Sequence, residues 1–120
     1  MNERIPFICY KKTKGDFMKK ITTNEFEKEV EKSEKPVIVK FYAEWCGPCK
    51  ALTPILEEVD NEVEDVTVVE VNVDDSGELA QKFGVRGIPT MLFMKDGQVK
   101  ATMVGNQAKA EILKKIKESF

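Results

Sequence analysis

Histidine is missing from the 120-residue sequence, and arginine is nearly so, with only Arg4 and Arg86 beside 17 lysines. Without histidine, the chain cannot use Ser-His-Asp or Cys-His catalysis, nor a metal site built on imidazole ligands. The planar guanidinium of arginine is favoured for recognising phosphates and bases, and the formal net charge is −2. The composition therefore argues against a nucleic-acid-binding protein that relies on positive charge.

Cysteine is scarce, and long apolar runs are absent. The sequence has three cysteines, Cys9, Cys46 and Cys49. A small secreted protein held together by disulfides usually has more cysteines than this, and an even number of them. No apolar run approaches the roughly 18 residues of a membrane span. The apolar stretch near the N-terminus, residues 5–10, contains Pro6 and is followed by no small-residue cleavage site. We therefore expect a cytoplasmic protein that does not associate with membranes.

The length fits one compact domain, preceded by a segment of different character. Hydrophobic residues make up 42% and charged residues 33% of the chain, a mixture typical of soluble globular proteins. Residues 1–17 combine a short apolar stretch with a lysine cluster. We assign residues 1–17 to an N-terminal extension and residues 18–120 to the domain. Cys9, in the extension, is interpreted as an incidental thiol, with an intermolecular disulfide as the alternative.

Strand-like and helix-like segments alternate from Met18 onward. Residues 37–42 are apolar at nearly every position, as in a strand that is buried on both faces. Thr22 with Glu25, and Asp75 with Glu78, have the spacing of the capping boxes that begin helices. In chain order, we expect strands at 19–22, 37–42, 66–73, 90–94 and 99–104, with helices after Thr22, at about 49–63, at 79–83 and around 112–116.

This order of elements predicts an α/β fold. Helices between successive strands imply parallel pairing, and the last two strands should form an antiparallel hairpin. Asp96 and Gly97 supply the positive φ angles that a tight hairpin turn needs, and Pro54 should kink the second helix. The predicted fold is a central mixed sheet of four to five strands flanked by helices on both faces.

The strongest chemical signal is the segment Trp45-Cys46-Gly47-Pro48-Cys49, at the junction between a buried strand and a helix. A helix N-terminus offers unpaired N–H groups and a partial positive charge, which would stabilise a thiolate at Cys46. Because the thiolate is the nucleophile in disulfide exchange, Cys46 is the expected attacking group. Cys49, one helical turn further along, is expected to resolve the mixed disulfide that results.

Three interpretations of these two cysteines compete. A zinc site needs about four ligands, and a metal site is disfavoured because Cys9 is the only other thiol and histidine is absent. A purely structural disulfide that closes so short a loop would stabilise the fold little. A redox-active dithiol is favoured, because two cysteines at this spacing beside a strand–helix–strand pattern are typical of redox motifs.

Longer motifs resemble the thioredoxin family over residues 18–120. Residues 41–50 resemble its active-site signature, and residues 85–90 resemble its second signature. Pro54 matches the proline in the active-site helix of the family, and Gly97 and Gly105 fall at its hairpin and last-loop glycines. The resemblance implies the thioredoxin fold and a dithiol that reduces protein disulfides with no metal or other bound cofactor.

The resemblance also implies a client-binding surface beside the cysteines. Pro89 should follow a cis peptide bond and face the two cysteines, leaving the main-chain N–H and C=O of Ile88 to pair with an extended client segment. The surface itself would be flat and mostly apolar, and it would be formed by Trp45, Gly87, Ile88 and Gly105.

The two residues between the cysteines indicate the direction of electron flow. In the thioredoxin family, Gly47 and Pro48 at these positions go with a reducing dithiol, whereas a histidine there goes with oxidants. Stronger stabilisation of the thiolate favours the reduced form and makes a better oxidant. Because no imidazolium can form, we expect this chain to act as a reductant.

Lys40 and Glu70 depart from the family pattern, which usually has an aspartate at the first position and a lysine at the second. A lone lysine buried in a central strand would be costly, and a reversed pair removes this objection because each charge supplies a partner for the other. We expect the two side chains to meet across adjacent strands below Cys49. Either the pair takes part in the proton transfer that deprotonates Cys49, or it only satisfies two buried charges; the sequence leaves both open.

Together these signals predict a general protein-disulfide reductase that works as a monomer. The resemblance implies disulfide-containing client proteins and a thioredoxin reductase as partners, the latter an NADPH- or ferredoxin-linked flavoenzyme. A reductase dedicated to one client and a binding module in which the cysteines are secondary are the alternatives.

Overall fold

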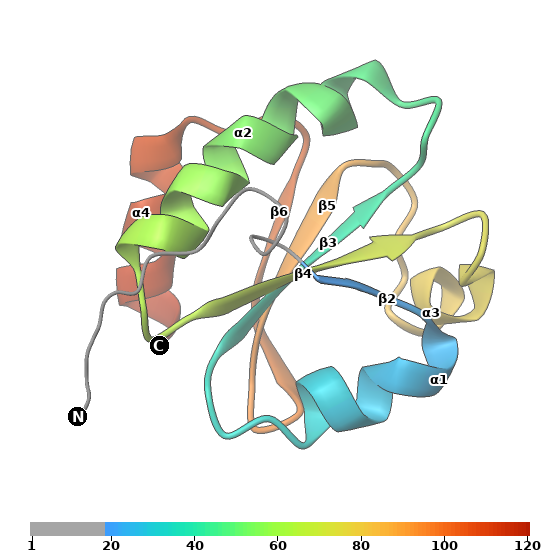
Figure 1. Ribbon diagram of the computed structural model, residues 1–120, viewed down its shortest axis with the longest axis horizontal. Coiled ribbons are helices and arrows are strands. Elements are labelled where there is room, and N and C mark those ends of the chain that lie inside the picture. Colours follow the sequence, from blue (N-terminus) through green and yellow to red (C-terminus); the bar gives the residue numbers. More distant parts are fainter. Residues whose placement is uncertain (1–18) are drawn as a thin grey trace.

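A five-stranded mixed sheet forms the centre of the molecule (Figure 1). The computed structural model describes residues 19–120; the N-terminal extension and Cys9 lie outside these described residues. The strand order is β2-β4-β3-β5-β6. β2 and β4 run parallel to β3, whereas β5 is antiparallel to β3 and β6 is antiparallel to β5. The strands are β2 (Lys19–Ile21), β3 (Val37–Tyr42), β4 (Thr67–Asn72), β5 (Thr90–Lys95) and β6 (Gln98–Val104).

Helices cover both faces of this sheet (Figure 1). One face packs against α1 (Thr23–Phe26), its π-helical continuation η2 (Glu27–Glu31) and α3 (Gly77–Lys82). The other face packs against α2 (Gly47–Glu62) and α4 (Lys109–Ser119). This arrangement confirms the predicted fold class. Among residues 19–120, no helix has both the length and the apolar character needed to cross a lipid bilayer.

Side chains along β3 alternate between the two faces of the sheet, and this alternation decides which side chains lie beneath α2. Val37, Val39 and Phe41 belong to the core beneath α1 and α3, whereas Ile38 belongs to the core beneath α2 and α4. Successive residues of a strand point to opposite faces, so Lys40 shares the α2 face with Ile38. Glu70 is the register partner of Lys40 on β4. The pleat thus directs two charged side chains under the helix that carries Cys49.

Two turns follow the sequence-based predictions. The backbone at Asp96 and Gly97 has φ angles of 55° and 78°, as a tight hairpin turn between β5 and β6 requires. Gly84 follows α3 with a φ angle of 69°, which only glycine adopts without a steric cost. At the start of α1, the Glu25 carboxylate accepts a hydrogen bond from the Thr22 N–H at 3.0 Å, so this predicted cap is confirmed.

The predicted capping box of Asp75 and Glu78 is wrong. The N-cap residue of α3 is Ser76 rather than Asp75, and the Ser76 hydroxyl oxygen accepts a hydrogen bond from the Thr23 N–H at 3.1 Å. A tertiary contact between two helix starts therefore takes the place of a local cap. Helix α2 also begins earlier than predicted, at Gly47, because Pro48 is well tolerated in the first turn. The helix continues through Pro54.

Candidate active site

Cys46 and Cys49 form a disulfide at the N-terminus of α2. Cys46 is the N-cap residue, and its Sγ accepts a hydrogen bond from the Cys49 N–H at 3.2 Å. This N–H is one of the donors that a helix start leaves unpaired. A thiolate at Cys46 would accept the same bond more strongly, because hydrogen bonds to charged acceptors are stronger than those to neutral ones. The helix start is therefore preorganised for an anionic sulfur at position 46.

The two cysteines differ in their surroundings. Cys49 is 1% exposed and Cys46 is 5% exposed. Cys49 lines a pocket beneath α2, whereas Cys46 lies in the loop that joins β3 to α2, directly after the exposed Trp45. Both cysteines are thus buried, Cys49 slightly more deeply, and Cys46 is the one that directly follows the exposed Trp45.

A shallow apolar pocket of about 360 Å³ adjoins Trp45. The Trp45 side chain is 71% exposed and donates a hydrogen bond from Nε1 to Asp74 Oδ2 at 3.0 Å. An exposed large aromatic side chain held in a fixed orientation is well suited to binding a partner. The pocket is lined by Trp45, Val73, Ala80, Val85, Arg86, Gly87 and Ile88. Three of the four predicted client-contact residues, Trp45, Gly87 and Ile88, therefore surround one pocket.

The fourth predicted contact residue, Gly105, does not line this pocket and is hydrogen-bonded to Pro89 instead. Its N–H donates a hydrogen bond to the Pro89 carbonyl oxygen at 2.8 Å, and its φ angle is 85°. The Ile88–Pro89 peptide bond is cis, and Ile88 packs against the cluster that contains Cys46 and Cys49. Gly105 thus adjoins Pro89 rather than the pocket beside Trp45.

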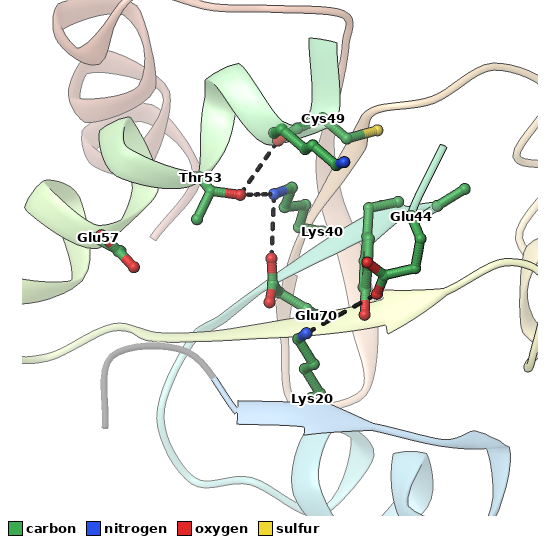
Figure 2. Close-up of a pocket in the computed structure, with 10 residues that line it drawn as sticks. Lys20, Lys40, Glu44, Cys49, Thr53, Glu57 and Glu70 are labelled. Carbon is green, nitrogen blue, oxygen red and sulfur yellow. Dashed lines mark hydrogen bonds and ion pairs between the residues drawn. The ribbon is translucent and has the colours of Figure 1, made fainter. Parts of the chain in front are cut away.

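A second pocket, of about 300 Å³, lies on the α2 face of the sheet and reaches Cys49 (Figure 2). Inside it, Lys40 Nζ lies 3.1 Å from Glu70 Oε2, and the two side chains are 1% and 8% exposed. The expected pairing across β3 and β4 is therefore present. The exposed residues Lys20, Glu44 and Lys50 also line this pocket, so it opens to solvent.

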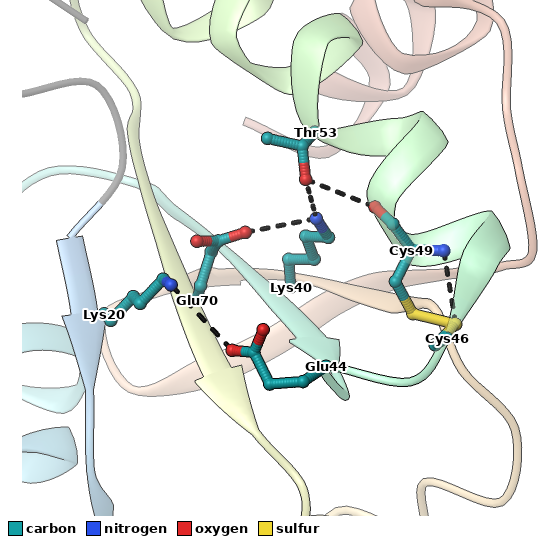
Figure 3. Close-up of polar contacts among 7 residues, drawn as sticks. All are labelled: Lys20, Lys40, Glu44, Cys46, Cys49, Thr53 and Glu70. Carbon is teal, nitrogen blue, oxygen red and sulfur yellow. Dashed lines mark hydrogen bonds and ion pairs between the residues drawn. A yellow bond between two sulfur atoms is a disulfide. The ribbon is translucent and has the colours of Figure 1, made fainter. Parts of the chain in front are cut away.

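Thr53 joins this pair, and the sequence analysis did not identify it. Lys40 Nζ donates to Thr53 Oγ1 at 2.7 Å, and Thr53 Oγ1 donates to the Cys49 carbonyl oxygen at 3.2 Å (Figure 3). Residues four apart on a helix share a face. The spacing between Cys49 and Thr53 was therefore a usable signal once Lys40 had been placed beneath α2.

The aromatic side chain of Tyr42 also lines this pocket. Its ring centroid lies 5.6 Å from Lys40 Nζ, close enough for a cation–π contact. Burial raises the pKa of Tyr42 above its ordinary value, and nearby Lys20 offsets part of this effect. The phenol is therefore neutral at physiological pH and does not add a negative charge to the pocket. In the described part of the chain, no group of three or more Cys, Asp or Glu side chains is arranged to hold a metal ion.

Comparisons with known proteins agree on one family. The family model described as Thioredoxin matches residues 17–118. A thioredoxin of Rickettsia bellii is 43% identical over 101 residues, which cover 83% of this chain and 96% of that protein. A thioredoxin of Rhodospirillum rubrum is 43% identical over 103 residues, which cover 85% of this chain and 99% of that protein. A thioredoxin of Acidithiobacillus ferridurans is 45% identical over 93 residues, which cover 77% of this chain and 86% of that protein.

Proposed function

The chain belongs to the thioredoxin family, and from this premise we propose that it is a general protein-disulfide reductase that uses Cys46 and Cys49. The observation that carries this proposal is the Cys46–Cys49 disulfide at the N-terminus of α2, beside an exposed tryptophan and an apolar pocket. The dithiol itself carries the two electrons, so the reaction requires no bound cofactor.

The reaction consists of two exchanges between sulfur atoms. The Cys46 thiolate attacks one sulfur of the client disulfide, forms a mixed disulfide with it and releases the other client sulfur as a thiolate. Cys49 then loses its proton and attacks Cys46 Sγ, which closes the Cys46–Cys49 disulfide and releases the second client sulfur. The client gains two electrons and the protein loses two. Gly47 and Pro48 keep the two cysteines one helical turn apart, and the absence of an imidazolium between them favours the reducing direction.

Client proteins bind next to Cys46. Trp45, Gly87 and Ile88 surround a pocket with a largely apolar lining, which suits the side chains that flank a client disulfide. The main chain of Ile88 pairs with an extended client segment beside Pro89, and Gly105 supports this edge through its hydrogen bond to the Pro89 carbonyl. A disulfide in a flexible, extended segment is the preferred substrate.

Family membership also supports a proposal for the wider cellular role. A thioredoxin reductase, an NADPH- or ferredoxin-linked flavoenzyme, returns the oxidised protein to the dithiol form, so that the chain acts in electron transport and in cell redox homeostasis. The protein works in the cytoplasm as a monomer. Residues 18–120 form the functional domain, and residues 1–17 are an extension to it.

Lys40 and Glu70 assist the second exchange. Their buried charges lie beneath Cys49, and Glu70, or a water molecule held by the pair, accepts the proton that Cys49 loses. The Glu70→Gln variant removes the carboxylate but keeps its size. We expect the pH profile of disulfide reduction by this variant to differ from that of the unmodified protein, because the proposed proton acceptor is lost. An unchanged pH profile would show that the pair only neutralises two buried charges.

Insulin reduction tests the proposed function directly. Dithiothreitol reduces insulin slowly, and the freed B chains precipitate. The protein is expected to accelerate this precipitation, because it transfers electrons from dithiothreitol to insulin faster than dithiothreitol reacts with insulin directly. A turbidity assay with and without the protein measures this. No acceleration would favour a binding module in which the cysteines are secondary, and acceleration with one client but not with insulin would favour a dedicated reductase.

A further inference from the structure

A chain of hydrogen bonds connects the buried ion pair to the resolving cysteine (Figure 3). It runs from Glu70 through Lys40 Nζ and Thr53 Oγ1 to the Cys49 carbonyl oxygen, with distances of 3.1, 2.7 and 3.2 Å. The side chains of Lys40 and Glu70 are only 1% and 8% exposed. The chain therefore lies in an environment of low dielectric constant, where interactions between charges are stronger than in water.

The chemistry of the groups fixes the direction of these hydrogen bonds. An ammonium group can only donate, so Thr53 Oγ1 accepts from Lys40. The single hydroxyl proton of Thr53 is then directed to the Cys49 carbonyl, which can only accept. Thr53 thus uses one lone pair and its only proton to hold the lysine against the turn of α2 that begins at Cys49.

The order of the charges beneath Cys49 follows from this arrangement. In both close-up views, Lys40 Nζ lies between the Glu70 carboxylate and Cys49 (Figures 2 and 3). Along this chain of hydrogen bonds, the cation therefore comes before the anion when counted from Cys49. A nearby cation favours the thiolate over the thiol, and the more distant carboxylate opposes this effect less strongly because Coulomb energy falls with distance.

Solvent reaches this network through a pocket that is separate from the one beside Trp45. The pocket that contains Lys40, Thr53 and Cys49 is lined by none of the residues that line the pocket beside Trp45. A client side chain that fills the pocket beside Trp45 would therefore not occupy the pocket beneath α2. The proton that Cys49 releases can pass to water there while the mixed disulfide is still in place.

We propose that Thr53 is a positioning residue for the second exchange: its hydroxyl holds the Lys40 ammonium beneath Cys49, where the cation stabilises the attacking thiolate. This inference rests on the proposed function and assigns a specific role within it. In the step concerned, the Cys49 thiol gives its proton to a water molecule held by the Lys40–Glu70 pair in the pocket beneath α2. The thiolate then forms a bond to Cys46 Sγ, and the client sulfur leaves as a thiolate with the electron pair of the broken bond.

A pH-jump experiment isolates this step. In a Cys9→Ser background, Cys46 is converted to a mixed disulfide with thionitrobenzoate at acidic pH, and the pH is then raised while the release of the coloured thiolate is followed. We expect Thr53→Val, which keeps the shape but lacks the hydroxyl, to slow the release about three- to tenfold near neutral pH. The midpoint of its pH profile should also move to higher pH.

Thr53→Ser is the matched control, because it keeps the hydroxyl and loses only a methyl group. Rates and a pH midpoint close to those of the unmodified protein would support the role of the hydroxyl. The proposal would be overturned by a Thr53→Val profile with an unchanged midpoint, or by an equal loss in Thr53→Ser, which would assign the effect to packing. Failure of the unmodified protein to release thionitrobenzoate would instead reject the proposed function itself.

Discussion

Insulin reduction is expected to fall to the rate of dithiothreitol alone when Cys46 is replaced by serine. A serine hydroxyl is far less acidic than a thiol and cannot form a disulfide, so the first exchange has no nucleophile. The substitution changes one buried sulfur to oxygen at the N-cap of α2, and serine is itself a favoured N-cap residue. Loss of activity with an unchanged fold, monitored by circular dichroism, would therefore reflect the chemistry alone.

Cys49→Ser is the control for this experiment, because it leaves the nucleophile in place and removes the resolving thiol. This variant should also lose turnover, but it should accumulate a covalent adduct with one insulin chain through Cys46, visible on a non-reducing gel and in the intact mass. In a Cys9→Ser background, an adduct on Cys46→Ser, or no adduct on Cys49→Ser, would contradict the assignment of the two roles.

Replacing Lys40 with methionine is expected to lower the free energy of unfolding by about 3–5 kcal/mol. Methionine fills a similar space, but it leaves Glu70, whose side chain is only 8% exposed, without the cation that lies 3.1 Å from its carboxylate. A buried charge without a partner is strongly destabilising. Urea unfolding of the oxidised proteins measures the effect, provided that the slope against denaturant concentration is the same for both.

Two controls separate burial from simple ion pairing. Lys82 and Glu31 also lie 3.1 Å apart, but their side chains are 58% and 29% exposed, so Lys82→Met should cost less than about 1 kcal/mol. The double variant Lys40→Met, Glu70→Leu should be more stable than Lys40→Met alone, because no buried charge remains without a partner. Equal effects of Lys40→Met and Lys82→Met would contradict the importance of burial for this pair.

Much of the fold and of the site could be predicted from the order of residues along the chain. The apolar run at 37–42 and the turn at Asp96 and Gly97 are local signals, and the structure has β3 and the β5–β6 hairpin at these places. The pairing of Lys40 with Glu70 was also within reach, because two charges of opposite sign in two buried parallel strands have few other partners.

Other features could not be predicted because they depend on contacts between distant segments. The Ser76 hydroxyl accepts from the Thr23 N–H, 53 residues away in sequence, so the spacing of Asp75 and Glu78 was misleading. The hydrogen bond from Trp45 to Asp74 joins two loops that no periodicity connects. Thr53 gains its role only from a lysine on another element. In each case the hydrogen-bond partner depends on how distant segments pack together, and the local sequence does not identify it.

Selective alkylation of the reduced protein tests the central claim most directly, namely that the sulfur at the helix start is the reactive nucleophile and its neighbour is protected. In a Cys9→Ser background at neutral pH, limited iodoacetamide should modify Cys46 much faster than an unperturbed cysteine in a short peptide and should leave Cys49 almost unmodified, as peptide mass spectrometry would show. Equal modification of Cys46 and Cys49, or a Cys46 rate no higher than that of the peptide, would contradict the account.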